Sequence, residues 1–234
     1  GAFAMDANTE GGCNVAVGRS ALAANTTGGS NVSVGSLALD ANTTASSNTA
    51  LGYAALSANT TGDSNTAVGR SALVTNQTGA DNVAVGRSAL LVNTASNNTA
   101  IGKDAMLENT TGANNTAVGM SALTSNVTGA ANTAVGTCAL QNVDASGNNA
   151  FGYFALYNTN SGTCNVAIGQ DSTRCNTSGS CNVSIGNQSL RSNTTASNNV
   201  AVGVSSLNAN TTGGENISIG RCSLNENTTG SQNT

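Results

Sequence analysis

A short motif recurs along the whole chain and leaves few folds open to it. Variants of Asn-(Thr/Val)-Ala-(Val/Ile)-Gly follow one another in steps of 17 residues, with two steps of 16. Self-similarity at such a period indicates a solenoid, in which each repeat packs only on its neighbours. The motifs begin at Asn14, Asn31, Asn48, Asn65, Asn82, Asn98, Asn115, Asn132, Asn148, Asn165, Asn182, Asn199 and Asn216, and again at Asn233.

The composition argues against a broad hydrophobic core and also against disorder. Aromatic residues make up 3% of the chain and charged residues 8%, and Trp, His and Pro are absent. Disordered chains combine few apolar residues with a high net charge, whereas this chain has a net charge of -4 and places Val, Ile or Leu at regular intervals. We therefore expect one repeat domain over residues 1–234 that buries small residues in every repeat.

Counted from the first Asn of the motif as position 1, the repeat reads N-T/V-A-V/I-G-x-S-A-L-x-x-N-T-T-G-x-x. Its two apolar runs, positions 2–4 and 7–9, are too short for helices and are bounded by Gly and Asn, which predicts strands. The predicted fold is all-β: a parallel β-solenoid, or β-roll, of about fourteen rungs, each with two short strands and an Asn-Thr-Thr-Gly turn. With a rise of about 4.8 Å per rung, the coil forms a rod.

Alternation along the strands predicts which columns of side chains face inward. Val17 at position 4 and Leu22 at position 9 are expected inside, and Ala16 and Ala21 at positions 3 and 8 outside. The outer alanines either allow close packing of another chain or reflect a tight coil. The Gly at position 5 predicts a corner with positive φ, and the Asn at positions 1 and 12 predict amide ladders between rungs.

The two ends and the charge pattern bear on partners. The chain begins and ends in mid-repeat without a capping segment, which favours a piece of a longer chain or fibre and self-association through open sheet ends. No run of 18 apolar residues and no basic patch occurs, so neither a membrane span nor nucleic-acid binding is expected.

Catalytic chemistry finds little support in the sequence. Histidine is absent and the acidic residues occupy different repeat positions, so stacking does not pair them. No nucleotide-binding, metalloprotease or calcium-roll motif occurs. We expect no enzyme, no cofactor and no metal site.

Cysteines suggest one disulfide. Cys164 and Cys181 share position 17 in consecutive rungs, about one strand spacing apart, which suits an inter-rung disulfide. Cys175 is an alternative partner for Cys181. The other three, Cys13, Cys138 and Cys222, are expected to be free or to bond a neighbouring molecule, and all six could equally be reduced small residues.

Asn-x-Ser/Thr sequons recur at the turn. If the protein is secreted through a glycosylating pathway, they predict a column of glycans, although Asn-Thr-Thr-Gly is also good turn chemistry in itself. The turn asparagines concerned, all at position 12, are Asn25, Asn42, Asn59, Asn76, Asn109, Asn126, Asn176, Asn193, Asn210 and Asn227. Further sequons lie at Asn31, Asn97, Asn114, Asn182, Asn187 and Asn216.

One rung concentrates aromatic residues. Tyr153, Phe154 and Tyr157 follow Phe151 within a few residues, and on a polar surface they are candidates for stacking on sugars, or else a local adjustment of the core. The Thr residues at positions 13 and 14 are adjacent and face opposite sides, so they support an ice-binding face only weakly.

The repeat resembles the N-T-x-x-G-x-x-A-x-x-x-N-T-T-G arrays of phage tail-fibre-like and bacterial surface proteins, and is more distantly similar to the head repeats of YadA-like adhesins. Residues 65–79 show the pattern. In those families the fold is a β-roll, commonly trimeric, used as a stalk or adhesive tip.

Together these features predict an extracellular structural fibre or surface filament subunit. It would be adhesive, would carry glycans if it is secreted through a glycosylating pathway, and would assemble end to end or side by side at a cell or virion surface. The alternative is a tail-fibre or adhesin module that binds a receptor or polysaccharide, and ice binding is a minor alternative.

Overall fold

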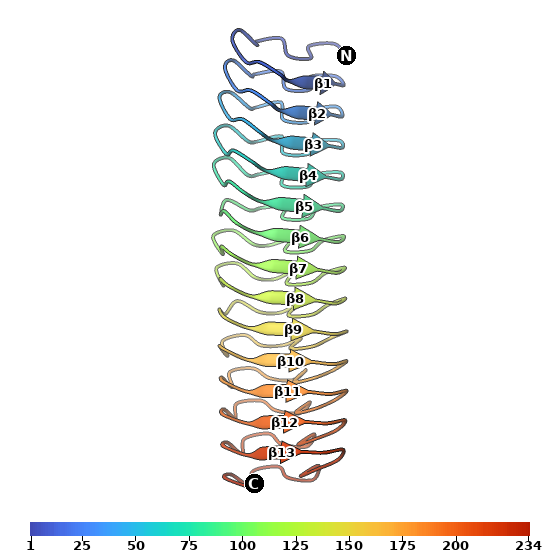
Figure 1. The fold of residues 1–234 in the computed structure, drawn as a ribbon, viewed down its shortest axis with the longest axis vertical. Coiled ribbons are helices and arrows are strands. Elements are labelled where there is room, and N and C mark those ends of the chain that lie inside the picture. The colour runs from blue at the N-terminus through green and yellow to red at the C-terminus, as the bar shows by residue number, and fades with distance from the viewer. The chain divides into compact units, whose positions relative to one another are not determined.

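The computed structural model describes residues 1–234, which divide into two compact units, Gly1–Asn115 and Thr116–Thr234. We call them unit 1 and unit 2. In each unit one turn of the chain makes one rung, and successive rungs stack in chain order (Figure 1). A single domain over residues 1–234 stays a prediction.

Each rung contributes one three-residue strand, formed by positions 2 to 4 of the repeat. Within a unit each strand pairs in parallel with the next, with equal repeat positions opposite one another, as for Val15 and Val32. The predicted parallel β-solenoid with a 17-residue repeat is confirmed. Unit 1 contains β1 (Val15–Val17), β2 (Val32–Val34), β3 (Thr49–Leu51), β4 (Thr66–Val68), β5 (Val83–Val85) and β6 (Thr99–Ile101); unit 2 contains β7 (Thr116–Val118), β8 (Thr133–Val135), β9 (Asn149–Phe151), β10 (Val166–Ile168), β11 (Val183–Ile185), β12 (Val200–Val202) and β13 (Ile217–Ile219).

The second strand predicted for each rung, at positions 7 to 9, does not form. Residues at positions 7 and 9 adopt left-handed conformations, as at Ser20 and Leu22, where φ is 54°. A strand requires negative φ throughout, so this segment is a series of turns instead. Its N–H groups still bind neighbouring rungs: Leu22 donates to the Ala38 carbonyl at 3.0 Å and Ser20 to the Ala2 carbonyl at 2.9 Å.

The predicted facing of the strand columns was wrong. Ala50 at position 3 is fully buried, whereas Leu51 at position 4 is 47% exposed, and Ala55 at position 8 is buried beside Leu56 at position 9. The interior beside the leucine column holds only Ala or Ser at position 3, so the larger strand residues point outward. The alanines are therefore core residues and form no outer stripe. Only the inward position of the leucine column was predicted correctly.

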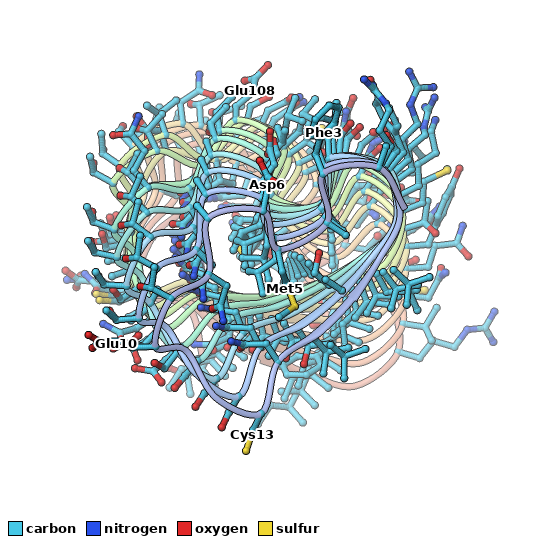
Figure 2. All side chains as sticks on the ribbon, turned by 90° about the horizontal axis from the view of Figure 1, so that it is seen from above. Phe3, Met5, Asp6, Glu10, Cys13 and Glu108 are labelled. Carbon is cyan, nitrogen blue, oxygen red and sulfur yellow. The ribbon has the colours of Figure 1, made fainter.

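An end view of the first turn shows the same arrangement. Met5 occupies position 9 and lies inside the ribbon, whereas Cys13 at position 17 points away from it (Figure 2). Phe3 at position 7 is 66% exposed.

The predicted glycine corner is confirmed. The position 5 glycines have φ between 125° and 142°, a region that residues with a side chain rarely adopt. A Cβ on Gly52 would also lie 2.6 Å from the carbonyl oxygen of Gly69 in the next rung. Both the corner and the rung spacing therefore require glycine.

The predicted asparagine ladders are confirmed as well, and they close the rung. At position 12, Asn42 Nδ2 donates to Asn25 Oδ1 at 2.8 Å and to the Ala45 carbonyl at 3.0 Å. At position 1, Asn31 Nδ2 donates to the same carbonyl at 2.9 Å, and Asn31 Oδ1 accepts the N–H of Asn48 at 2.9 Å. The two columns thus fasten the turn to the strand and each rung to the next.

Candidate functional site

The outward side chains of the strands form a regular surface on each unit, and we call positions 2 and 4 of the strands the outer sheet face. Ten of the sixteen exposed large hydrophobic residues of the chain lie on it. They are Val15, Val17, Val32, Leu51 and Ile101 in unit 1, and Phe151, Ile168, Ile185, Ile217 and Ile219 in unit 2.

None of the 26 positions of this face, two in each of thirteen strands, carries a charge. Position 2 holds Val, Thr, Ile or one Asn, and position 4 holds Val, Ile, Leu or one Phe. Charge depletion with retained apolar area is typical of the core of a protein interface. The sequence analysis did not predict this face, although the sequence contains a signal for it. Position 2 varies and includes Thr and Asn149, which is typical of exposed positions, whereas position 3 is always Ala or Ser, which is typical of a buried position with little space.

The candidate glycan acceptors at position 12 lie inside the coil. Nine of the ten are fully buried, and Asn227 in the last turn is half-buried. Where the ladder runs, the amide nitrogen that would carry the glycan donates two hydrogen bonds, as in Asn210, which donates to Asn193 Oδ1 at 3.2 Å and to the Gly213 carbonyl at 2.9 Å. A glycan there would break both hydrogen bonds and would have no space in the interior.

Three other sequons are exposed. Asn97 and Asn114 at position 17 in unit 1, and Asn187 at position 6 in unit 2, lie on the surface. The remaining sequons at position 1, Asn31, Asn182 and Asn216, are fully buried. An exposed asparagine whose amide nitrogen makes no hydrogen bond within the chain is thus found at three sequons, while the half-buried Asn227 donates to Asn210 Oδ1 and to the Gly230 carbonyl.

The structure brings Cys164 and Cys181 to neighbouring places. Both are exposed, both have a φ of 59°, and the Cys181 N–H donates to the carbonyl of Thr163 at 3.0 Å. All six cysteines are free thiols in the structure: Cys13 and Cys222 are also exposed, and Cys138 and Cys175 are half-buried. Burial raises the pKa of the Cys138 thiol. The inter-rung disulfide stays a prediction.

The predicted aromatic residues do gather on unit 2. The rings of Tyr153 and Phe154 lie 4.2 Å apart, and those of Phe154 and Tyr157 lie 4.9 Å apart at nearly a right angle. The guanidinium of Arg174, one rung on, lies 4.8 Å from the Phe154 ring centre and forms an ion pair with Asp171 at 3.2 Å. Tyr153 is 48% exposed, so part of this aromatic cluster is accessible from solvent.

The carboxylate of Asp144 marks the place of a missing turn residue. Asp144 lies in one of the two 16-residue rungs, and its Oδ1 accepts the N–H groups of Val127, Thr128 and Gly129 at 3.0, 2.6 and 3.1 Å. Partial burial alone would raise the pKa of Asp144, but these hydrogen bonds outweigh it and lower the pKa. The carboxylate therefore fastens the shortened turn.

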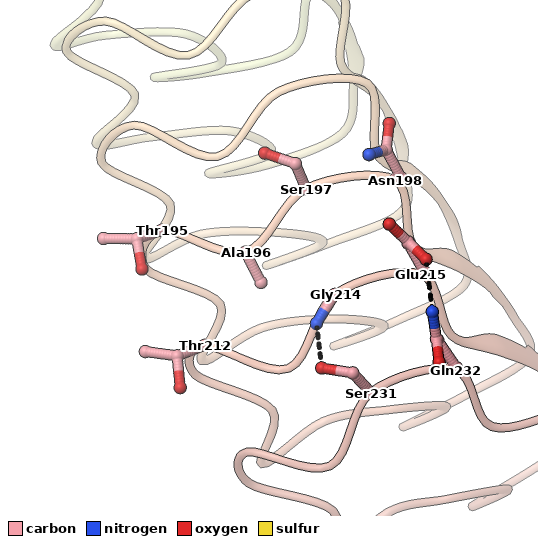
Figure 3. Close-up of a pocket in the computed structure, with 9 residues that line it drawn as sticks. All are labelled: Thr195, Ala196, Ser197, Asn198, Thr212, Gly214, Glu215, Ser231 and Gln232. Atoms are coloured by element: carbon pink, nitrogen blue, oxygen red, sulfur yellow. Dashed lines mark hydrogen bonds between the residues drawn. The ribbon is translucent and has the colours of Figure 1, made fainter.

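A shallow hollow of about 360 Å³ lies between the turns near the end of unit 2 (Figure 3). Its polar groups already bind one another: the Gly214 N–H donates to Ser231 Oγ at 3.1 Å, and Gln232 Nε2 donates to Glu215 Oε2 at 3.0 Å. Nowhere do three or more Cys, Asp or Glu side chains gather so as to hold a metal ion. A helix with the length and apolarity needed to cross a bilayer is not found.

Comparison of the chain with protein-family models, with curated proteins and with solved structures gave no match.

Proposed function

We propose that this chain is a structural subunit of an extracellular fibre or surface filament, and that its copies associate side by side through the outer sheet face. The observation that carries the proposal is the uncharged apolar surface made by positions 2 and 4 of the strands. On the seven strands of unit 2, two files of side chains spaced as in a sheet cover on the order of 300 Å². Patches of that size on a monomer commonly mark an interaction site.

Other features agree with this role. The repeat resembles those of tail-fibre-like and bacterial surface proteins, and the described polar groups of the hollow and of the turns are used to hold rungs together rather than to form a reactive site. A glycan coat, if the protein is secreted, would be limited to the three exposed sequons.

The test compares two double variants in the same two rungs of unit 2. Ile185→Lys with Val202→Lys places two charges on the outer sheet face, whereas Thr195→Lys with Thr212→Lys places them on exposed turn residues. Sedimentation velocity and electron microscopy at several concentrations should show assemblies for the unmodified chain and the turn variant, and monomers for the face variant. A chain that remains monomeric at all concentrations would refute the proposal.

A second candidate function, binding of a receptor or polysaccharide, is favoured by the aromatic cluster. Four of the six aromatic residues of the chain lie in one rung, and sugars stack on exposed rings. Glycan-array binding should be lost in Tyr153→Ala and retained in Tyr53→Ala, which removes a ring at the same repeat position with 52% exposure but no aromatic neighbour. Absence of binding to every glycan would exclude this function.

Ice binding has the least support. The position 13 hydroxyls on which a Thr array would depend are engaged between rungs, as when Thr26 Oγ1 donates to the Thr43 carbonyl at 3.0 Å.

A further inference from the structure

Strand β9 differs from every other strand on the outer sheet face of unit 2. Its position 2 is Asn149 and its position 4 is Phe151, whereas the other six strands carry Thr, Val or Ile at position 2 and Val or Ile at position 4. Phe151 is 41% exposed and Asn149 is half-exposed. The Asn149 side chain takes part in none of the hydrogen bonds within the chain. An amide that makes no hydrogen bond within the chain thus stands in a column that otherwise holds Thr, Val and Ile.

A surface made of identical rungs does not by itself fix how two copies align along the coil, and the irregular strand β9 can fix that alignment. Where all strands present the same residues, two copies can slide past one another by one rung, about 4.8 Å, and recover nearly the same contacts. Only an irregular strand distinguishes one alignment from the next. In unit 2 that strand is β9.

We infer that Asn149 and Phe151 set the register in which copies of this chain associate, with β9 of one copy against β9 of the next. This inference rests on the proposed function. An amide carries both donor and acceptor groups, so the Asn149 side chains of parallel copies can bind one another where they meet, and Phe151 lies beside that contact. A single buried Asn fixes register in coiled coils for the same reason.

A slip of one rung would lose these contacts. It would place the Asn149 of one copy against Val166, which has no side-chain group to accept or donate a hydrogen bond, and the Asn149 of the other copy against Thr133, whose single hydroxyl replaces only part of the amide pair. It would also separate the two Phe151 side chains by one rung. Equal heights of all copies also allow a closed ring, whereas a constant stagger produces an open helical assembly. The β9 strand therefore favours a closed bundle over a staggered one.

The position of β9 in unit 2 indicates that the copies run parallel. It is the third of seven strands, so antiparallel copies of unit 2 centred on β9 would overlap only from β7 to β11, and β12 and β13 would have no partner in the unit 2 of the other copy. A parallel pair in register covers all seven strands.

Disulfide cross-linking between copies measures the register directly. The six native cysteines are replaced by serine, a residue that already occupies each of their repeat positions at Ser20, Ser30 and Ser125. Single cysteines are then introduced as Val200→Cys in β12 or Val183→Cys in β11. Val200→Cys should cross-link with itself about tenfold more than with Val183→Cys, since a mis-registered pair leaves an amide unsatisfied.

Asn149→Thr with Phe151→Val converts β9 into a copy of β8 and should bring that ratio close to one. The matched control, Val166→Thr with Ile168→Val in β10, should leave the ratio unchanged. If the unmodified chain associates but Val200→Cys does not prefer itself, or the β9 variant keeps the preference, the register inference is wrong while self-association stands. If the unmodified chain is monomeric, the proposed function itself fails.

Discussion

Single asparagines connect three rungs in this fold. Asn182 donates its backbone N–H to Asn165 Oδ1 at 3.0 Å, its Nδ2 to the Ala196 carbonyl at 2.9 Å, and accepts the N–H of Asn199 at 3.0 Å. Because all of these groups are buried, none can turn to water instead. The asparagine columns thus satisfy backbone groups at the turn and at the residue that precedes each strand.

We predict that Asn182→Ala lowers the free energy of unfolding by about 1–3 kcal/mol, the cost of leaving buried partners unpaired. Asn187→Ala, five residues away and exposed, should change it by less than about 0.5 kcal/mol. Urea denaturation followed by circular dichroism measures both. Equal midpoints for the two variants would contradict the role assigned to the ladder.

Asp144 gives a pH-dependent prediction at the same scale. Its pKa is lower in the folded protein than in the unfolded chain, so its carboxylate stabilises the fold above the unfolded pKa of about 4, and this contribution is lost as the pH falls through the folded pKa. Asp144→Asn should therefore reduce stability at pH 7 by about 1 kcal/mol, because solvent screens part of the interaction. As the pH falls below about 4 the difference in stability between the two proteins should shrink, and it should vanish below the folded pKa. A difference that persists at low pH would indicate packing rather than charge as the cause.

The two halves of a rung differ in what they tolerate. The strand places alternate residues inside and outside, so its length sets which side chains enter a narrow interior. The turn already varies within unit 1, where residues 82–97 form a rung of 16 residues and the turn around Thr94 is one residue shorter.

Deletion of Thr61, an exposed turn residue, should accordingly be tolerated, with a fall in Tm of a few degrees for about 1 kcal/mol. Deletion of Ala67 in β4 should abolish cooperative melting of unit 1. The deletion shifts the strand by one residue, so that Thr or Val must occupy the interior space that now holds the methyl group of Ala67. Thermal unfolding followed by circular dichroism distinguishes them. Similar melting of both deletions would mean that the strand register is not decisive.

Sequence reasoning reached the period, the parallel coil, the glycine corner and the asparagine ladders, because each follows from residues that recur at one position. It failed at positions 7 to 9, where side-chain pattern alone cannot reveal left-handed backbone at a residue such as Leu22. Because a second strand was expected there, the inward and outward side chains of the first strand were also predicted the wrong way round. A two-stranded rung has room for Val between its strands, whereas in a rung with one strand and a chain of turns the inward strand position holds only Ala or Ser. The outer sheet face could therefore not be found before the fold was known.

On the scale of the whole molecule, the sequons form two sets, one exposed and one buried. The turn asparagines serve the ladder, while Asn97, Asn114 and Asn187 project from the surface. Because the attached nitrogen differs between the sets only in burial and hydrogen bonding, burial should decide which sites a folded chain can carry.

We predict that the chain, secreted from a cell with N-glycosylation, bears glycans only at those three exposed asparagines. Peptide mass spectrometry after enzymatic removal of glycans in heavy-oxygen water reports occupancy site by site. Asn97→Gln, Asn114→Gln and Asn187→Gln combined should leave an unglycosylated protein that folds as before, since none of the three amides supports a neighbouring rung. Occupied turn sites in a folded, secreted chain would show that the ladder can open, and would make the asparagine columns a sugar-bearing surface instead of the fastening of the coil.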